Sequence, residues 1–452
     1  MKRVTRLAAL ALTLSLLLTG CGTGGGGAVP RQAVALAAAV QNALYPNEEL
    51  YLGSDGSFDG EGYDRDWQAW WEEAAARAEA SEQARGALDA FFSAFTAAAL
   101  AESGNQVISP VNLYLALAML AECTGGETRA ELLDLLGAGD LDTLRRRTDA
   151  IWRSQHYDDG RTTSLFSASL WLEEGIAFNQ DTLEDLALRH RADSYSGDLG
   201  SQEMNTLLQT WLSDHTGGLL KEAAGQVELD PDTVLALATA VCFKGSWLDE
   251  FPQSQTRPQT FHAPEGDLET DFMRRSDTMT YYREADFSAV FLPLSGGERM
   301  WLVLPEEGVS PRQLLERGDV QAFLLSGGET AEQSRPLVHL ELPKFDVTQS
   351  LNLIPTLKAL GITRVFEGGD FSPVFAQDLD AALTQATHAA RVKIDEQGLE
   401  AAAFTVLAVS ETAAELPAEE LTLTLDRPFL FSLSSAGDLP LFTGVVERPA
   451  GQ

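Results

Sequence analysis

Residues 387–403 read THAARVKIDEQGLEAAA, and residues 404–426 continue as FTVLAVSETAAELPAEELTLTLD. An acidic turn ends at Gly398, and small or β-branched residues then follow as far as Val409. Such residues fit the interior of a pleated sheet and lose little side-chain entropy on ordering. A polar tail containing Pro417, typical of an exposed loop, comes directly after them. The sequence therefore predicts a β-strand that is held outside a sheet.

Alternation along this segment supports the same interpretation. Successive side chains of a strand point to opposite faces, so every second residue shares a face. One face would carry Leu399, Ala401, Ala403, Thr405, Leu407 and Val409. Because most of these side chains are small, the segment could slide between existing strands.

From about residue 85 onward, helical and strand patterns are interleaved without a fixed repeat. Ser109 and Pro110 have the N-cap and first-turn chemistry that begins a helix. Residues 338–342 alternate apolar and polar, as a half-buried strand does, and residues 235–243 form an unbroken apolar run. That run predicts a strand covered on both faces. The fold class is expected to be α+β, with mixed β-sheets surrounded by helices.

The start of the chain resembles a bacterial lipoprotein signal. Basic residues precede a short apolar run at residues 7–18, and Leu18-Thr19-Gly20-Cys21 ends it. Residues 1–20 are therefore predicted to be a signal peptide, and Cys21 to be lipidated. The alternative is an ordinary signal peptide in which Cys21 is incidental. We expect residues 21–30 to be a Gly-rich tether and the protein to be exported, anchored to the cell membrane and facing the extracellular side or periplasm.

Residues 31–84 form a region of their own and are interpreted as an N-terminal extension of a main domain at residues 85–449. A cluster of tryptophans, Trp67, Trp70 and Trp71, is expected to pack the extension on that domain. The acidic stretch from Asp55 to Asp66 approximates a calcium loop, but it lacks the closing Glu, so a solvated loop is favoured.

Composition excludes several classes of function. The formal net charge is −35, with 67 acidic and 32 basic side chains, so nucleic acid is an unlikely partner. Cys123 and Cys242 lie in apolar settings, which favours buried free thiols over a disulfide. The histidines have no metal-ligand spacing and no Gly-x-Ser-x-Gly motif is present, so the sequence predicts no metal site, no cofactor and no enzyme activity.

Several stretches, in order, resemble the serpin family and together cover about residues 85–449. The resemblance rests on residues 105–112 with 125–128, residues 239–247, residues 342–345 with 360–366, residues 387–403, and residues 426–431 with 442–446. It implies a serpin fold with an exposed reactive-centre loop at about residues 396–425. Serpin loop insertion is itself an established case of strand addition to a sheet.

The resemblance also implies a function and site residues. A monomeric protein is expected to inhibit a serine-type, or also a cysteine-type, endopeptidase as a suicide substrate. The implied hinge comprises Glu396, Gly398, Leu399, Glu400, Ala401, Ala402 and Ala403. The implied central opening region comprises Ser109, Asn112, Thr239, His388 and Trp247. Leu399, Asn112 and Thr239 depart from the family's usual residues, which leaves open a non-inhibitory binding or structural surface lipoprotein.

The scissile bond is predicted to lie between Thr412 and Ala413, counting forward from Gly398. Counting back from Pro428 gives Pro417 instead, so the loop is about five residues longer than the common pattern. No Lys or Arg lies between residues 399 and 426, and the neighbours of the predicted bond are small. An elastase-like or subtilisin-like protease is therefore favoured as the partner over a trypsin-like one.

Overall fold

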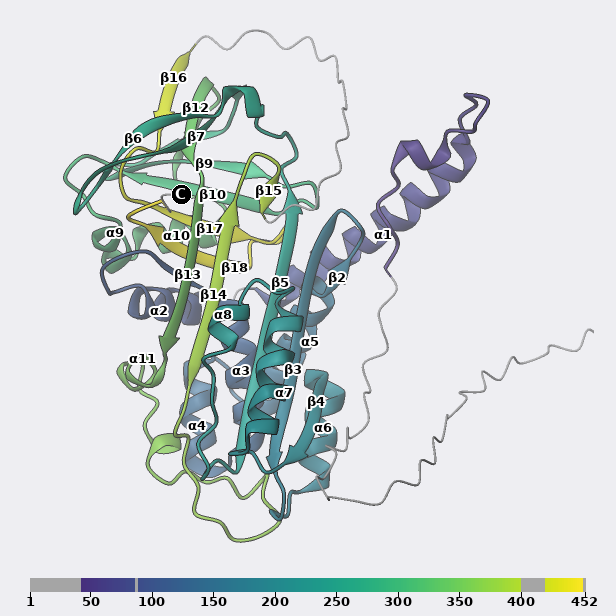
Figure 1. The fold of residues 1–452 in the computed structure, drawn as a ribbon, viewed down its shortest axis with the longest axis vertical. Helices are drawn as coiled ribbons and strands as arrows, with labels where there is room; N and C mark the ends of the chain where they lie inside the picture. The colour runs from purple at the N-terminus through teal and green to yellow at the C-terminus, as the bar shows by residue number, and fades with distance from the viewer. Residues whose placement is uncertain (1–41, 86–87, 400–418, 450–452) are drawn as a thin grey trace, which may run out of the picture.

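The computed structural model describes residues 42–85, 88–399 and 419–449, which form three β-sheets with helices packed around them (Figure 1). This arrangement confirms the predicted α+β class. The α-helices are α1 (Gly60–Ala84), α2 (Asp89–Ala99), α3 (Pro110–Cys123), α4 (Gly126–Leu135), α5 (Leu141–Gln155), α6 (Gln180–His190), α7 (Gln202–His215), α8 (Lys221–Ala224), α9 (Pro311–Arg317), α10 (Asp319–Leu325) and α11 (Ile354–Ala359). Short 3-10 helices cover Glu48–Tyr51, Gln253–Gln255 and Arg364–Phe366.

Seven strands form what we call the central sheet. Its order is β13 (Phe345–Asn352), β14 (Thr387–Ile394), β15 (Gly398–Leu399), β5 (Leu235–Ser246), β3 (Thr162–Glu173) and β2 (Tyr157–Asp158), and β4 (Ala192–Gly197) pairs with β3. Most neighbours are antiparallel, whereas β4 runs parallel to β3. β5 and β14 both pair antiparallel with the short β15 and therefore run in the same direction.

Two further sheets lie at the end of the central sheet that carries β15 (Figure 1). One has the order β1 (Gln106–Ile108), β18 (Pro440–Val446), β17 (Phe429–Ser434), β10 (Arg299–Pro305), β9 (Phe287–Pro293), β8 (Tyr281–Arg283) and β11 (Glu332–Ser334). The other has the order β16 (Glu420–Thr424), β12 (Leu337–Pro343), β7 (Gly266–Thr278) and β6 (Arg257–Ala263). β15 and β16 therefore belong to different sheets, and the 20 residues between Leu399 and Glu420 join them.

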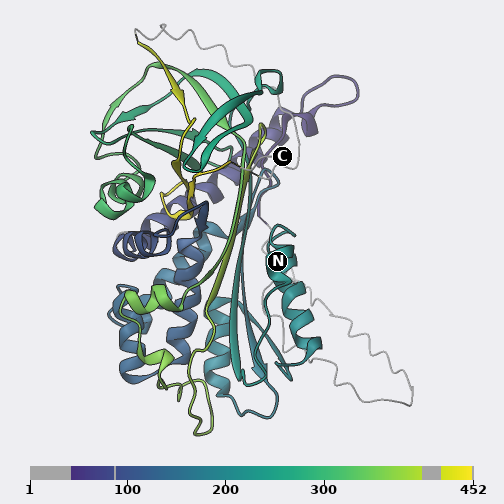
Figure 2. The same ribbon diagram turned by 60° about the vertical axis from the view of Figure 1, so that its left-hand side comes forward.

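Helices cover both faces of the central sheet. Figure 2 shows the sheet nearly edge-on, with α7 on one face and α3 among the helices on the other. A large core lies on the α3 side and includes Val241 and Phe243 of β5, while a smaller one beneath α7 joins Trp171 and Trp211 to Ala240. Alternate residues of β5 thus enter different cores, which explains its unbroken apolar run.

The structure differs from two local expectations. α3 begins at Pro110 as predicted, but the Ser109 side chain makes no capping hydrogen bond to it. Residues 235–239 of β5 are only half-buried, although a strand covered on both faces was expected. The reason is that β5 has a full-length neighbour on one side only. Cys123 and Cys242 are both buried, as predicted, and Cys123 is a free thiol.

The N-terminal extension packs on the body through α1, but through one of the three tryptophans only. Trp70 is buried and its indole N–H donates to Asp159 Oδ2 over 2.8 Å, whereas Trp67 and Trp71 are exposed. Arg77 lies over the ring of Tyr157 at 4.1 Å and strengthens the same contact. Across the described ranges, no helix is both long and apolar enough to cross a membrane.

Candidate functional site: the gap between β5 and β14

A gap separates β5 from β14 over most of their length. β15 pairs with β5 only at Gly245 and Ser246, and with β14 only at Ile394. β5 has 12 residues and β14 has eight, so ten and seven residues respectively extend beyond these pairs. In the part of the chain that the structure describes, no strand lies between them there. At one end of the central sheet, the two residues of β15 therefore join β5 to β14. Over the rest of their length β5 and β14 are separated.

Gly398 fits where no other residue would. A Cβ atom at this position would lie 2.2 Å from the carbonyl oxygen of Gly245, and the φ angle of Gly398 is +155°. Both facts favour glycine, because the backbones of β15 and β5 approach each other too closely for a side chain. The requirement explains why the acidic turn ends in Gly398.

The turn before β15 is held by backbone and side-chain contacts. The backbone N–H of Trp247 donates to Gln397 O, and its indole N–H donates to Asp395 O, each over 2.9 Å. Glu396 Oε1 lies 2.7 Å from Lys344 Nζ and accepts a hydrogen bond from Thr256. Although burial alone would raise it, the pKa of Glu396 is lowered below its usual value by these two partners. A charged Glu396 thus fixes the point from which β15 starts.

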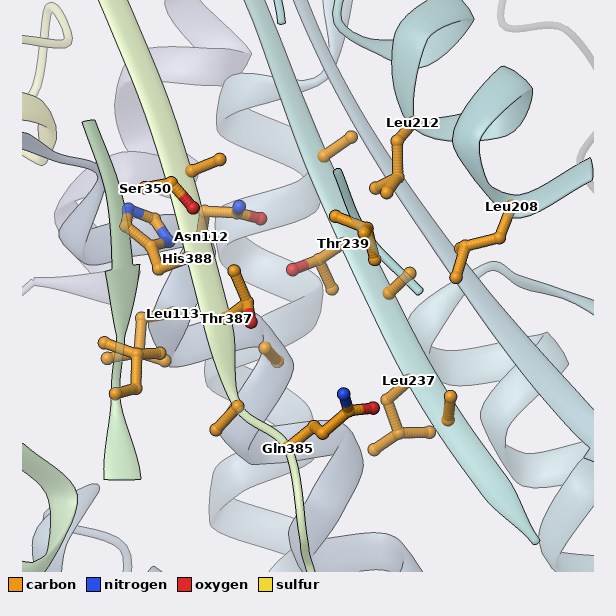
Figure 3. A pocket seen from close by; sticks show the side chains of 18 of the residues that line it. Asn112, Leu113, Leu208, Leu212, Leu237, Thr239, Ser350, Gln385, Thr387 and His388 are labelled. Carbon is orange, nitrogen blue, oxygen red and sulfur yellow. The ribbon is translucent and has the colours of Figure 1, made fainter. Parts of the chain in front are cut away.

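A cavity of about 670 Å³ occupies the gap below β15. Its walls are β5 and β14, and it is lined by residues of α3 on one side and of α7 and α8 on the other. Figure 3 shows Asn112 and Thr239 directed toward the space between the two strands, while Leu208 and Leu212 project from α7 toward β5. The cavity is elongated along the strands and mostly apolar, which suits an extended peptide segment.

Polar side chains meet at the middle of this cavity. His388 Nε2 accepts a hydrogen bond of 2.9 Å from the backbone N–H of Ser109, and burial lowers the pKa of His388 to about 4. The imidazole is therefore neutral at pH 7. Ser109 Oγ and Asn112 Oδ1 are buried without a hydrogen-bond partner among the described residues. Unpaired buried polar atoms are costly, so this place would gain from a polar group entering the gap.

Most of the residues predicted for the opening region come together here. Ser109, Asn112, Thr239 and His388 all line the cavity. Trp247 lies elsewhere, at the end of the sheet beneath the turn at residues 395–397, because it follows the last residue of β5. Of the residues predicted for the hinge, Gly398 and Leu399 form β15, and Glu396 lies in the turn before it. Glu400, Ala401, Ala402, Ala403, Thr412, Ala413 and Cys21 lie outside the described residues.

The sequence model of one protein family matches residues 88–449, and its description is serpin, a serine protease inhibitor. The chain belongs to the serpin family. The match covers the three sheets and begins just before α2, so α1 lies outside it.

Individual serpins resemble the chain over most of their length. Serpin-Z1C from Triticum aestivum is 28% identical over 362 residues, which cover 77% of this chain and 90% of the relative. The native state of the thermophilic serpin tengpin has a TM-score of 0.71 at 23% identity, covering 80% of this chain and 92% of that one. Human thyroxine-binding globulin complexed with its ligand has a TM-score of 0.68 at 21% identity, covering 80% and 99%. At these identities the two structures establish the fold alone.

The family match corrects one prediction. The sequence predicted that the chain is not an enzyme, whereas the match places it in a family that is described as serine protease inhibitors and is therefore defined by its action on enzymes.

Sequence reasoning missed three contributors to the site. Lys344, which directly precedes β13, and Thr256, which directly precedes β6, both contact Glu396. They lie 52 and 140 residues from Glu396 along the chain. The third contributor is Gly245, whose backbone lies close to that of Gly398. Two of them, Gly245 and Lys344, stand in stretches that carry the family resemblance, and this was the available signal.

Proposed function

We propose that this serpin inhibits a serine protease as a suicide substrate, and that its reactive loop lies at about residues 396–425. The observation that carries the proposal is the gap between β5 and β14, already entered at one end by β15. In this mechanism the protease cuts the loop and forms an acyl-enzyme, and the freed segment then continues β15 down the gap.

The register of β15 supports a specific arrangement for the inserted segment. Leu399 lies opposite Gly245 and Ile394. Continuing that register brings Thr405 opposite Thr239 and His388, on the face that looks toward α3. Its hydroxyl could then serve Asn112 Oδ1, which is buried without a partner among the described residues. Thr405, the polar residue on an otherwise apolar face of the segment, would thus contact the polar side chains at the middle of the cavity.

The same register would also accommodate Phe404, which is bulky within a run of small residues. Phe404 would lie on the α7 face, opposite Ala240 and Ala389. Both neighbours are alanines, so the sheet leaves room for a large side chain between them. On the α3 face, Ala403 would lie between Val241 and Ala390. Phe404 would thus be flanked by small residues on the α7 face, which favours close packing.

The free energy of insertion is large enough for trapping. About ten inserted residues gaining roughly 1 kcal/mol each in net hydrogen bonding give on the order of 10 kcal/mol. A protease carried along by the segment would have its acyl group pulled away from its oxyanion donors. Each donor lost slows hydrolysis by roughly 10² to 10³.

The proposed target is elastase-like or subtilisin-like, with cleavage between Thr412 and Ala413. The experiment is incubation with an elastase-like serine protease, followed by denaturing electrophoresis and N-terminal sequencing of the released fragment. A covalent complex that survives denaturant, with a new N-terminus at Ala413, is expected. Cleaved chain without complex at any ratio of inhibitor to protease would contradict inhibition.

A non-inhibitory serpin with a binding or structural role is the second candidate, and Leu399 favours it. This large side chain is already buried at the start of the gap. Anchoring of the hinge at Leu399 could slow insertion until the acyl-enzyme has hydrolysed. A Leu399→Thr variant separates the two candidates: if the natural chain is cleaved without trapping and the variant traps, the anchoring account holds.

We further propose export and lipid anchoring through Cys21, supported by the basic and apolar pattern of residues 1–20 and the Leu-Thr-Gly-Cys sequence that ends at Cys21. In a bacterial host, the natural chain should incorporate labelled fatty acid and fractionate with membranes. Cys21→Ser should abolish both. Labelling that persists in the Cys21→Ser variant would contradict the assignment.

A further inference from the structure

Most of the strongly exposed apolar side chains of the described residues lie on the first half of α1 and on the segment that precedes it. Eight large apolar side chains of the described residues are strongly exposed, and six of them lie between residues 44 and 71. We call this region the aromatic tip, and its exposed members are Leu44, Leu50, Leu52, Phe58, Trp67 and Trp71. Leu50 is 76% exposed and Trp71 is 60% exposed. Such concentration on one small element marks an interaction surface more often than chance exposure does.

The aromatic tip is a built structure. Its rings form a continuous chain, with Tyr51 5.4 Å from Tyr63, Tyr63 stacked on Trp67 at 6.0 Å, and Tyr45 5.1 Å from Trp70. The hydroxyl of Tyr51 donates to Asp66 over 2.8 Å. Tryptophan and tyrosine held in fixed positions supply large contact areas at low entropic cost, as binding hot spots do.

The tip stands near the start of the reactive loop. Trp70 ties α1 to Asp159, whose backbone N–H donates to Thr162 O. Thr162 pairs with Gly245, and Gly245 pairs with Leu399. Asp159 is thus three strands from the hinge, a distance of about 14 Å at the usual strand spacing. Figures 1 and 2 both show the free end of α1 at the end of the molecule that carries β15 and β16.

The charge of residues 42–85 indicates what kind of partner would bind the aromatic tip. Residues 42–85 contain 11 Asp and Glu and three Arg, which gives the extension a net charge of −8. A second copy of a chain of net charge −35 would be repelled, and so would an anionic bilayer. An acidic surface with protruding aromatic and leucine side chains is complementary to a basic protein surface that carries apolar residues.

We propose that the aromatic tip is a second contact surface for the protease that attacks the reactive loop, namely a protease with a basic, partly apolar surface beside its active site. This inference rests on the proposed function. A standard interface buries about 800 Å² on each partner and is therefore about 30 Å across. A protease bound at the loop is wide enough to reach α1. The tip would raise the rate of association and select among proteases that cut the same sequence.

The test uses two elastase-like proteases, one of basic and one of acidic isoelectric point, against the mature chain. The tip variant is Leu50→Ser with Trp71→Ser, and the matched control is Leu188→Ser, which removes a side chain that is 68% exposed on α6. For the basic protease, the second-order rate constant of inhibition should fall about tenfold in the tip variant and remain unchanged in the control. For the acidic protease, neither variant should differ from the natural chain.

A direct binding measurement separates failure of this inference from failure of inhibition. The basic protease, with its catalytic serine replaced by alanine, should bind the natural chain about tenfold more tightly than the tip variant, and the difference should shrink at high salt. If no covalent complex forms but this difference persists, inhibition fails and the contact surface stands. Equal affinities and equal rates overturn the inference, as would a tip variant that changes only self-association or binding to vesicles of anionic lipid.

Discussion

Cleavage of the reactive loop should raise the melting temperature, and the structure gives the size of the effect. Insertion of about ten residues contributes on the order of 10 kcal/mol at roughly 1 kcal/mol per residue. The serpin domain spans residues 88–449, which are 362 residues. At about 2.1 cal/mol/K per residue, its entropy of unfolding is about 0.76 kcal/mol/K, so the melting temperature should rise by about 13 °C.

The assay compares natural and protease-cleaved chain by calorimetry or circular dichroism. Ala403→Glu provides the decisive variant, since the register places residue 403 between Val241 and Ala390, in the main core. Burying a carboxylate there costs several kcal/mol, enough to remove much of the gain. Ala414→Glu is the matched control, because residue 414 lies beyond Val409, the residue whose partner would be Leu235 at the end of β5.

Two results would refute the reasoning. A cleaved natural chain that melts within about 3 °C of the intact one would mean that the freed segment gains little from the gap. A cleaved Ala403→Glu chain that gains as much as the natural one would mean that the segment does not follow the register of β15. The Ala414→Glu chain should gain the full increase.

Three further predictions concern the uncut protein. Burial lowers the pKa of His388 to about 4, so its stabilising contribution is complete above the unfolded value near pH 6.5 and lost as the pH falls toward 4. Urea denaturation should therefore show a loss between pH 7 and pH 4.5 that is about 3 kcal/mol smaller in His388→Gln. Gly398→Ala should lower the free energy of unfolding by more than about 1 kcal/mol, since its Cβ would meet Gly245 O, whereas Gly139→Ala, with open space around it, should have little effect. Trp70→Phe should cost about 1 to 3 kcal/mol by leaving Asp159 short of a donor, whereas Trp71→Phe should be neutral; equal effects would contradict the role given to Trp70.

The strands of the central sheet could be predicted from the sequence, but the gap between β5 and β14 could not. The apolar run at residues 235–243 identified β5, because alternate residues of that strand enter two different cores. That its neighbour on one side is missing could not be predicted, since pairing depends on residues of β14 that lie 149 positions away along the chain. The segment after Gly398 gave the indirect signal, because strand-like composition followed by a loop-like tail indicates a strand without a place in the sheet.

Contacts between distant residues limited the prediction of the site in the same way. We grouped Trp247 with the opening residues, but it lies beneath the hinge because β5 extends beyond the cavity. The tryptophan cluster predicted that the extension packs on the body, but only the partner Asp159, 89 residues away, determines that Trp70 is the buried member. Side-chain partners that come from separate elements leave no local pattern.

The position of the charged hinge explains how a stable chain can hold an incomplete sheet. Glu396 is fixed by Lys344 and Thr256, and Gly398 is fitted against Gly245, so β15 is fixed in register before any insertion begins. β16, which follows the proposed loop, belongs to a different sheet from β15. On the proposed mechanism, cutting the loop would remove that connection and leave the register of β15 unchanged. The direction and depth of insertion would therefore be set by contacts that already exist in the uncut protein.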